Sequence, residues 1–158
     1  MDYLDWDIFG ENEACIKTNV SFRIGGESID PIQITNELSI HPSRSCAKGD
    51  EYTSHNGRIL RRSIGHWSIS TEWLLESTST EKHAKLLLTI LKPAYRSILK
   101  YVEDPKTGTS IVFWWETDAG HGGFSLSPDT MKRLCKFCND IEFHFIGGDH
   151  ETEDGEAD

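Results

Sequence analysis

Apolar or β-branched side chains alternate with polar ones along residues 16–24, and this pattern limits the fold more than any other part of the chain. Successive side chains of a β-strand point to opposite faces of a sheet, so the alternation predicts a strand with one buried face and one solvated face. We therefore expect a sheet that is mainly antiparallel, with helices packed on one of its faces.

Five further segments have the composition or the alternation of strands, and they fall at residues 58–64, 66–73, 109–116, 124–126 and 141–146. The segment 109–116 is the most apolar, with large side chains facing both ways, which favours a central place in the sheet. Trp67 and Trp73 are expected to share one face, and Phe143 and Phe145 are expected to point inward. Between the strands, residues 41–57 are rich in Ser, Gly and charged residues and predict a long loop.

Three helices are predicted from their start signals, in which a capping side chain precedes a proline or completes a capping box. The signals are Asp30-Pro31, Thr78-Ser-Thr-Glu81 and Ser127-Pro128. An apolar stripe continues from the second signal to Val102, and Pro93 within it predicts a kink or a break near Lys92.

The resulting order of elements is β-α-β-β-α-β-β-α-β, which predicts an α+β fold. A chain of 158 residues with 37% hydrophobic residues can build one continuous core but not a second full domain. Residues 22–40 and 124–145 both have the order strand, helix, strand, and they are candidates for two similar halves.

The net charge of −10 is concentrated at the two ends of the chain. Residues 1–13 and 149–158 together contain eleven acidic side chains and no Lys or Arg, whereas residues 14–148 are close to neutral. We expect an acidic N-terminal segment (1–13), a single α+β domain (14–148) and a disordered acidic tail (149–158). A folded part without a strongly basic surface argues against a general nucleic-acid partner.

The first residues lack an apolar signal region, and no apolar run reaches the length of a membrane span, so we expect a cytoplasmic protein without membrane contact. The four cysteines are expected to be thiols. Cys135 and Cys138 fall on the apolar side of the third helix, which favours core packing over a metal or redox pair. The seven histidines are scattered along the chain, and we predict neither a metal site nor a cofactor.

The segment from His41 to His66 is the candidate binding site, because it carries a local charge of +3 in an otherwise nearly neutral domain. Such a patch can receive a phosphate, an acidic partner or the acidic tail. The alternative is a strand edge that positive charge protects against aggregation. The candidate binding residues are Arg44, Lys48, Arg58, Arg61, Arg62 and His66.

Several short motifs are shared with a known group of proteins, and they are Phe22-x-Ile24-x-Gly26, Ile29-Asp30-Pro31, Ile34-Thr35, Leu38-x-Ile40-x-Pro42-Ser43, Lys48-Gly49 and Trp67. In these motifs the chain resembles a bacterial family catalogued as a domain of unknown function, over about residues 16–147. The motifs are mostly caps, turns and core positions, so the resemblance implies a shared fold and carries over no functional residue. It also implies a small bacterial cytoplasmic protein.

Two functions are expected from the sequence. No nucleophile elbow, phosphate-binding loop or dinucleotide motif occurs, so no catalytic residue is predicted. The first function is a non-catalytic protein-binding module, of the toxin-neutralising immunity type by analogy with other small acidic proteins. The alternative is a small-molecule or anion-binding domain, enzymatic or not, that uses the basic segment 44–66. Association of copies through a strand edge is a further option.

Overall fold

The computed structural model describes residues 7–148, and five of its strands form one mixed sheet in the order β2-β5-β1-β6-β7. These strands are β1 (Lys17–Gly26), β2 (Arg44–Cys46), β5 (Gly65–Ser70), β6 (Gly108–Thr117) and β7 (Asp140–Gly147). A separate two-stranded ribbon contains β3 (Glu51–Thr53) and β4 (Ile59–Arg61). The helices are α1 (Pro31–Leu38), α2 (Thr80–Leu91), α3 (Tyr95–Glu103) and α4 (Pro128–Leu134), with the short 3-10 helix η2 (Lys92–Ala94) between α2 and α3.

The sheet is antiparallel except at one edge. β1 lies in the middle and pairs antiparallel with β5 and β6, and β2 pairs antiparallel with β5. β7 runs parallel to β6, which is possible because the chain crosses over through α4 between them. The predicted α+β class with a mainly antiparallel sheet is confirmed, and β6 lies inside the sheet as its apolar sequence suggested.

Two of the three predicted helix starts are confirmed by their capping bonds, whereas α2 is capped by Ser79, one residue after the predicted Thr78. Asp30 accepts a hydrogen bond from the N–H of Ile32 at the start of α1 (2.9 Å), and Ser127 accepts one from the N–H of Thr130 in α4 (3.1 Å). Pro93 has no N–H to donate and clashes with the preceding helical turn, so the chain changes to a 3-10 turn at η2. The expected break near Lys92 is therefore present, and it separates α2 from α3.

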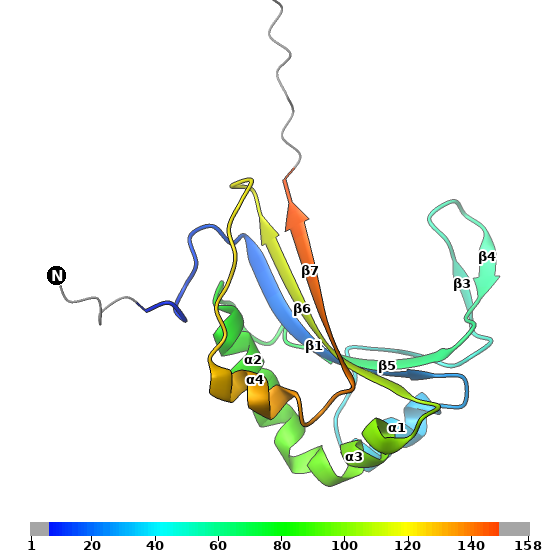
Figure 1. The fold of residues 1–158 in the computed structure, drawn as a ribbon. Coiled ribbons are helices and arrows are strands. Elements are labelled where there is room, and N and C mark those ends of the chain that lie inside the picture. Colours follow the sequence, from blue (N-terminus) through cyan, green and yellow to red (C-terminus); the bar gives the residue numbers. More distant parts are fainter. Residues whose placement is uncertain (1–6, 149–158) are drawn as a thin grey trace, which may run out of the picture.

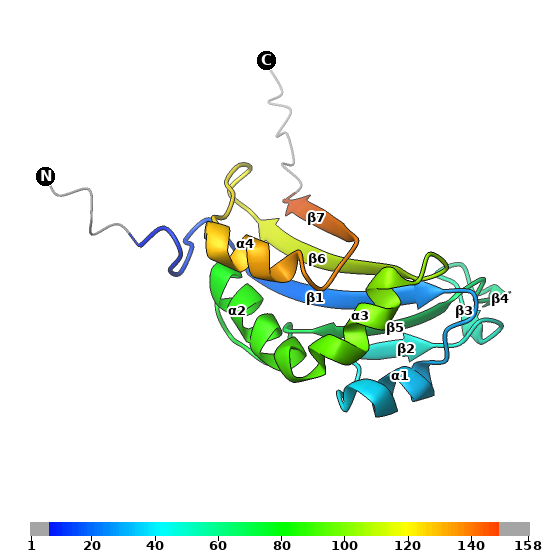
Figure 2. The same cartoon turned by 60° about the horizontal axis from the view of Figure 1, so that its bottom comes forward.

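The helices cover one face of the sheet, and the core lies between the two layers (Figure 2). Alternate residues of β1 point into this core, and Val20, Phe22 and Ile24 are fully buried there. Leu87 and Leu91 of α2 belong to the same buried cluster. Burying one such side chain stabilises a fold by about 1.5–3 kcal/mol. The alternation along β1 therefore determines which face of the sheet the helices cover.

The opposite face of the sheet is covered by none of the helices of residues 7–148, and we call it the open face (Figure 1). The β3–β4 ribbon extends away from the sheet on this side (Figure 1). The open face displays the polar residues of β1, which are Lys17, Asn19, Ser21 and Arg23.

Two of the predicted strands are largely absent. The segment 58–64 contains only the short strand β4, which pairs with β3 inside the region expected to be a loop. Residues 124–126 form no strand, because Phe124 packs its ring on Phe113 (5.7 Å between ring centroids) instead of entering the sheet. Only the first of the two candidate halves therefore begins with a strand.

One predicted face and one predicted degree of burial are also corrected. β5 ends at Ser70, so Trp73 does not continue the buried face of Trp67 and is 84% exposed. Phe143 and Phe145 point to the core side, as predicted, and Phe143 stacks on the buried Phe113 at 5.2 Å between ring centroids. They are nevertheless 48% and 57% exposed, because α4 packs on α2 and does not extend over the edge strand β7.

The cysteines are free thiols, as expected. The predicted core packing of Cys135 is wrong, since α4 ends at Leu134 and leaves Cys135 exposed. Cys138 is half-buried against the core.

No helix in residues 7–148 is long and apolar enough to cross a membrane. The predicted tail 149–158 and residues 1–6 lie outside the described residues. Within the predicted acidic segment, Glu11 accepts hydrogen bonds from the hydroxyl of Ser77 (2.5 Å) and the N–H of Thr78 (2.7 Å). These bonds lower the pKa of Glu11 to about 2 and tie the segment to the chain ahead of α2.

Candidate functional site

Two arginines lie in one row of the open face. Arg44 of β2 is opposite Ser68 of β5, and Ser68 is opposite Arg23 of β1. Residues directly opposite each other in a sheet point to the same side. Ser68 points to the open face, because its neighbours Trp67 and Ile69 point into the core. Arg23 and Arg44 are therefore on the same side of the sheet, with one strand between them.

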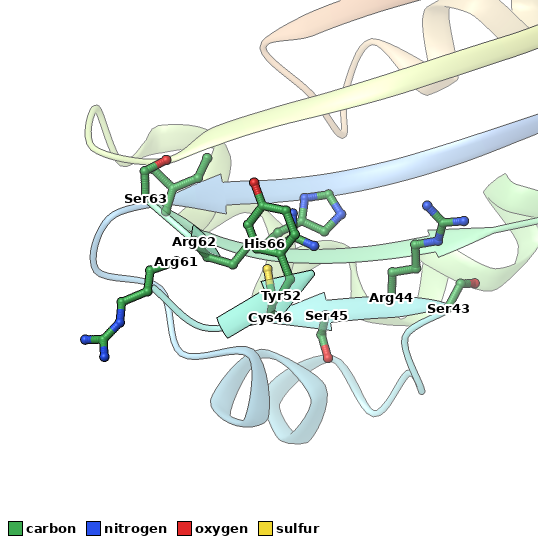
Figure 3. Close-up of a pocket in the computed structure, with 10 residues that line it drawn as sticks. Ser43, Arg44, Ser45, Cys46, Tyr52, Arg61, Arg62, Ser63 and His66 are labelled. Atoms are coloured by element: carbon green, nitrogen blue, oxygen red, sulfur yellow. The ribbon is translucent and has the colours of Figure 1, made fainter. Parts of the chain in front are cut away.

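The β3–β4 ribbon brings a third arginine to this end of the sheet. Arg62 follows β4 directly, and its N–H donates to the carbonyl of Asp50 (2.9 Å) while its carbonyl accepts from Gly49 (2.8 Å). Its guanidinium lies 3.8 Å from the centre of the Tyr52 ring, a cation–π contact that holds the side chain. Figure 3 shows Tyr52 and Arg62 next to His66 of β5.

His66 lies where the charges of these arginines converge. Burial is the main cause that lowers the pKa of His66 below its ordinary value, and the charges of the three arginines lower it further. The ring is therefore neutral at pH 7, and its Nε2 lies 3.1 Å from the hydroxyl oxygen of Ser68. We use the name basic cluster for Arg23, Arg44, Arg62 and His66.

The basic cluster has little acid to neutralise it. Arg44 and Arg62 take part in none of the ion pairs formed within residues 7–148, and Arg23 lies 3.6 Å from Glu142. An exposed pair of that kind contributes about 0–1 kcal/mol, so a ligand can replace it at small cost. The cluster thus presents positive charge that a bound anion could neutralise.

The structure brings together half of the predicted binding residues, namely Arg44, Arg62 and His66, all of which line one hollow. Their convergence depends on the pairing of β2 with β5, which sets Cys46 opposite His66 and places Arg44 two residues away on the same face.

The other predicted residues do not join the basic cluster, although Arg61 also lines this hollow. Arg61 points away from His66 in Figure 3 and pairs with Glu51 at 3.1 Å. Lys48 pairs with Glu27 at 3.4 Å, and Arg58 is exposed at the turn of the ribbon. Adjacent side chains of a strand point in opposite directions, which explains why Arg61 and Arg62 do not act together.

Arg23 belongs to the basic cluster but not to the predicted set. The alternation along β1 already placed its side chain on the solvated face. Only the pairing of β1 with β5 brings it near His66, and that pairing joins residues about forty positions apart in the sequence.

Two adjoining hollows follow the open face. One, of about 820 Å³, lies at the basic cluster and reaches Tyr52, and the other, of about 560 Å³, extends along the sheet to Trp73 and Trp114. Ligand sites usually have volumes of about 300–1,000 Å³. The residues that line both hollows are Ser43, Arg44 and His66, so the two form one continuous groove, here called the open-face groove.

The groups in the open-face groove favour binding of an oxyanion. Guanidinium groups donate hydrogen bonds in a planar fork that matches the oxygens of phosphate or carboxylate. Hydroxyl groups of Ser43 and Ser68 add donors beside them. Within residues 7–148 no group of three His, Cys, Asp or Glu side chains is arranged to hold a metal ion.

Comparisons of the chain with curated proteins and with solved structures found no similar protein. A family described as a domain of unknown function, DUF4279, matches residues 16–147. The matched span runs from β1 to the end of β7 and includes the whole basic cluster, and it confirms the resemblance suggested by the sequence. The chain therefore belongs to the DUF4279 family of domains of unknown function.

Proposed function

We propose that this domain binds an anionic ligand, through a phosphate or carboxylate group, at the basic cluster. The observation that carries the proposal is that Arg44 and Arg62 line one hollow with the half-buried ring of His66, and that Arg23 lies in the same row of the sheet as Arg44. Two of these arginines have no acidic partner among the described residues, so their charge is available to a ligand.

The free energy gained by binding an anion is greatest where the groove contains the basic cluster. A hydrogen bond to a charged group contributes about 1.5–3 kcal/mol, roughly twice the value for neutral groups. Tyr52 holds the Arg62 guanidinium in place before a ligand arrives, which reduces the entropy lost on binding. The ring of His66 can also take up a proton when an anion binds, which would add a further charge-assisted bond.

A second candidate function is a protein-binding module, and the observation that favours it is the apolar surface of the ribbon. Ile59 of β4 is 71% exposed and Leu60 is 42% exposed. An isolated two-stranded ribbon is at best marginally stable, and a partner that covers these side chains would stabilise it. An immunity-type partner stays a prediction from the sequence.

The anion proposal is tested by calorimetric titration with inorganic pyrophosphate and with citrate at 0.1 M salt. The test variant is Arg44→Ala with Arg62→Ala. The matched control is Lys48→Ala with Arg58→Ala, which removes the same charge from the same segment outside the basic cluster. Loss of two charge-assisted bonds should weaken binding by about 100-fold or more in the test variant.

The control variant should bind almost as tightly as the wild type, because general attraction between distant charges is screened within about 10 Å at 0.1 M salt. Equal weakening in both variants would mean that only net charge matters. The proposal is refuted if neither pyrophosphate nor citrate binds the wild type. Melting curves would confirm that each variant is folded.

A further inference from the structure

The open-face groove extends well beyond the basic cluster. Arg23 is opposite Ser110 of β6, and Trp114 lies four residues further along the same strand on the same face. At about 3.3 Å per residue, this separation is about 13 Å along the sheet. A simple anion bound at the basic cluster would leave most of that length empty.

Two tryptophans mark the far end of the groove. Trp73 is 84% exposed and lines the groove from the segment after β5. The ammonium group of Lys17 lies 5.3 Å from the centre of its ring and restricts its movement. Trp114 is half-buried and stacks on His144 at 6.2 Å between ring centroids. Exposed indole rings of this kind provide flat surfaces on which a planar group can stack.

The floor between the two ends is polar and uncharged. It consists of side chains that can both donate and accept hydrogen bonds. Ser21 and Ser70 lie opposite each other between the two ends, Ser68 lies in the row of the arginines, and Asn19 lies opposite Trp114. Such groups are suited to the hydroxyl groups of a sugar. Along the groove the order is therefore cationic, then hydroxyl-rich, then aromatic.

The charges along the groove argue against a long polyanion. Glu72 and Glu116 accompany Lys17 at the aromatic end, and Lys17 forms an ion pair with Glu72. This end carries a net charge of about −1 by simple counting, which would repel phosphates placed along the whole groove. A single phosphate at the basic cluster avoids that repulsion.

We infer that the ligand of the open-face groove is a mononucleotide. Its phosphate would lie at the basic cluster, its ribose over the serine and asparagine floor, and its base against Trp73 and Trp114. The inference rests on the proposed function, since it takes the anion site as the place of the phosphate, and it adds a sugar and a planar base as the features that the rest of the groove recognises.

The test is calorimetric titration of the full chain with the four ribonucleoside 5′-monophosphates, with ribose 5-phosphate, and with a ten-nucleotide single strand of DNA. The test variant is Trp73→Ala, and the matched control is Leu74→Ala, an exposed neighbour that does not line the groove. Stacking of a base on an aromatic ring is lost in the test variant, which should weaken the best nucleotide by about 5-fold to 100-fold. The affinities of ribose 5-phosphate in the test variant and of the nucleotide in Leu74→Ala should stay unchanged.

Other results would overturn the inference in distinguishable ways. If ribose 5-phosphate binds as tightly as every nucleotide and Trp73→Ala changes nothing, the base plays no part and only the anion site stands. Tighter binding of the DNA strand than of any mononucleotide would identify a polymer as the ligand. If none of these phosphates binds, and pyrophosphate and citrate do not bind either, both the proposed anion site and the nucleotide inference are refuted.

Discussion

Replacing Glu81 with alanine tests how α4 is held against α2. Glu81 lies in the first turn of α2 and is only 2% exposed. Its carboxylate accepts hydrogen bonds from the N–H of Ser127 (3.1 Å), the hydroxyl of Ser127 (2.8 Å) and the hydroxyl of Thr130 (2.6 Å). Lys85, one turn along the helix, is 3.6 Å away. One buried carboxylate of α2 therefore accepts the hydrogen bonds that Ser127 and Thr130 donate at the start of α4.

The magnitude follows from these bonds. Each hydrogen bond to a charged group contributes about 1.5–3 kcal/mol net, and the Ser127 N–H and the Thr130 hydroxyl both lose their acceptor. We expect Glu81→Ala to lower the free energy of unfolding by about 3–5 kcal/mol, the usual range for breaking a buried charged contact. For a chain of this size, each 1 kcal/mol lowers Tm by about 2–4 °C, so Tm should fall by about 6–20 °C.

The assay is denaturant and thermal unfolding at neutral pH, with Glu103→Ala as the control. Glu103 is an exposed glutamate of α3 outside the ion pairs of residues 7–148, and its replacement should change the free energy of unfolding by less than about 0.5 kcal/mol. A loss below about 1 kcal/mol for Glu81→Ala would refute this view of the α2–α4 contact.

Glu81→Gln adds a test by pH. Burial alone would raise the pKa of Glu81, but hydrogen bonds from Thr130 and Ser127 and the charge of Lys85 together lower it. The folded state therefore favours the charged form, and the stability it provides is full above the unfolded pKa of about 4.3 and is lost as pH falls through the folded pKa. The advantage of the wild type over Glu81→Gln should shrink below that pH, and a constant difference would contradict the charge assignment.

Three further predictions concern the core and the groove. Trp67→Phe removes a hydrogen bond from the buried indole N–H to the hydroxyl of Thr35 (3.0 Å), so denaturation should show a loss of about 2 kcal/mol, and no loss would contradict it. Burial lowers the pKa of His83, so its contribution to stability is full above about pH 6.5 and is lost as the pH falls further. The wild type should therefore lose more stability on acidification than His83→Gln, and equal losses would count against it. Pyrophosphate should slow alkylation of Cys46 in the groove but not of the exposed Cys135, as followed by mass spectrometry, and equal rates would argue against a ligand there.

The sequence predicted those parts of the fold that depend on neighbouring residues. Alternation along residues 16–24 identified the buried face of β1, and Pro93 identified the break between α2 and α3. The parallel pairing of β7 was not predicted, because it depends on how the chain crosses over through α4. Phe124 was assigned to a strand because it is apolar, whereas it packs as part of a loop on Phe113.

The candidate site could be predicted only in part for the same reason. Arg44, Arg62 and His66 stood out as a local excess of positive charge. Local charge could not show that Arg61 points away, since the direction of its side chain depends on the register of the ribbon. Arg23 enters the site through long-range pairing, which the sequence of a single chain does not specify.

Nuclear magnetic resonance of the His66 ring tests anion binding at the basic cluster most directly. The pKa of His66 is lowered by burial and by the three arginine charges. An anion bound among these arginines offsets their charge, so titration of the ring in saturating pyrophosphate should give a higher pKa than titration without it. The ring of His55, exposed in the ribbon turn, serves as the internal control, and its chemical shift should not respond to the anion. A His66 titration that is the same with and without pyrophosphate would contradict anion binding at this site.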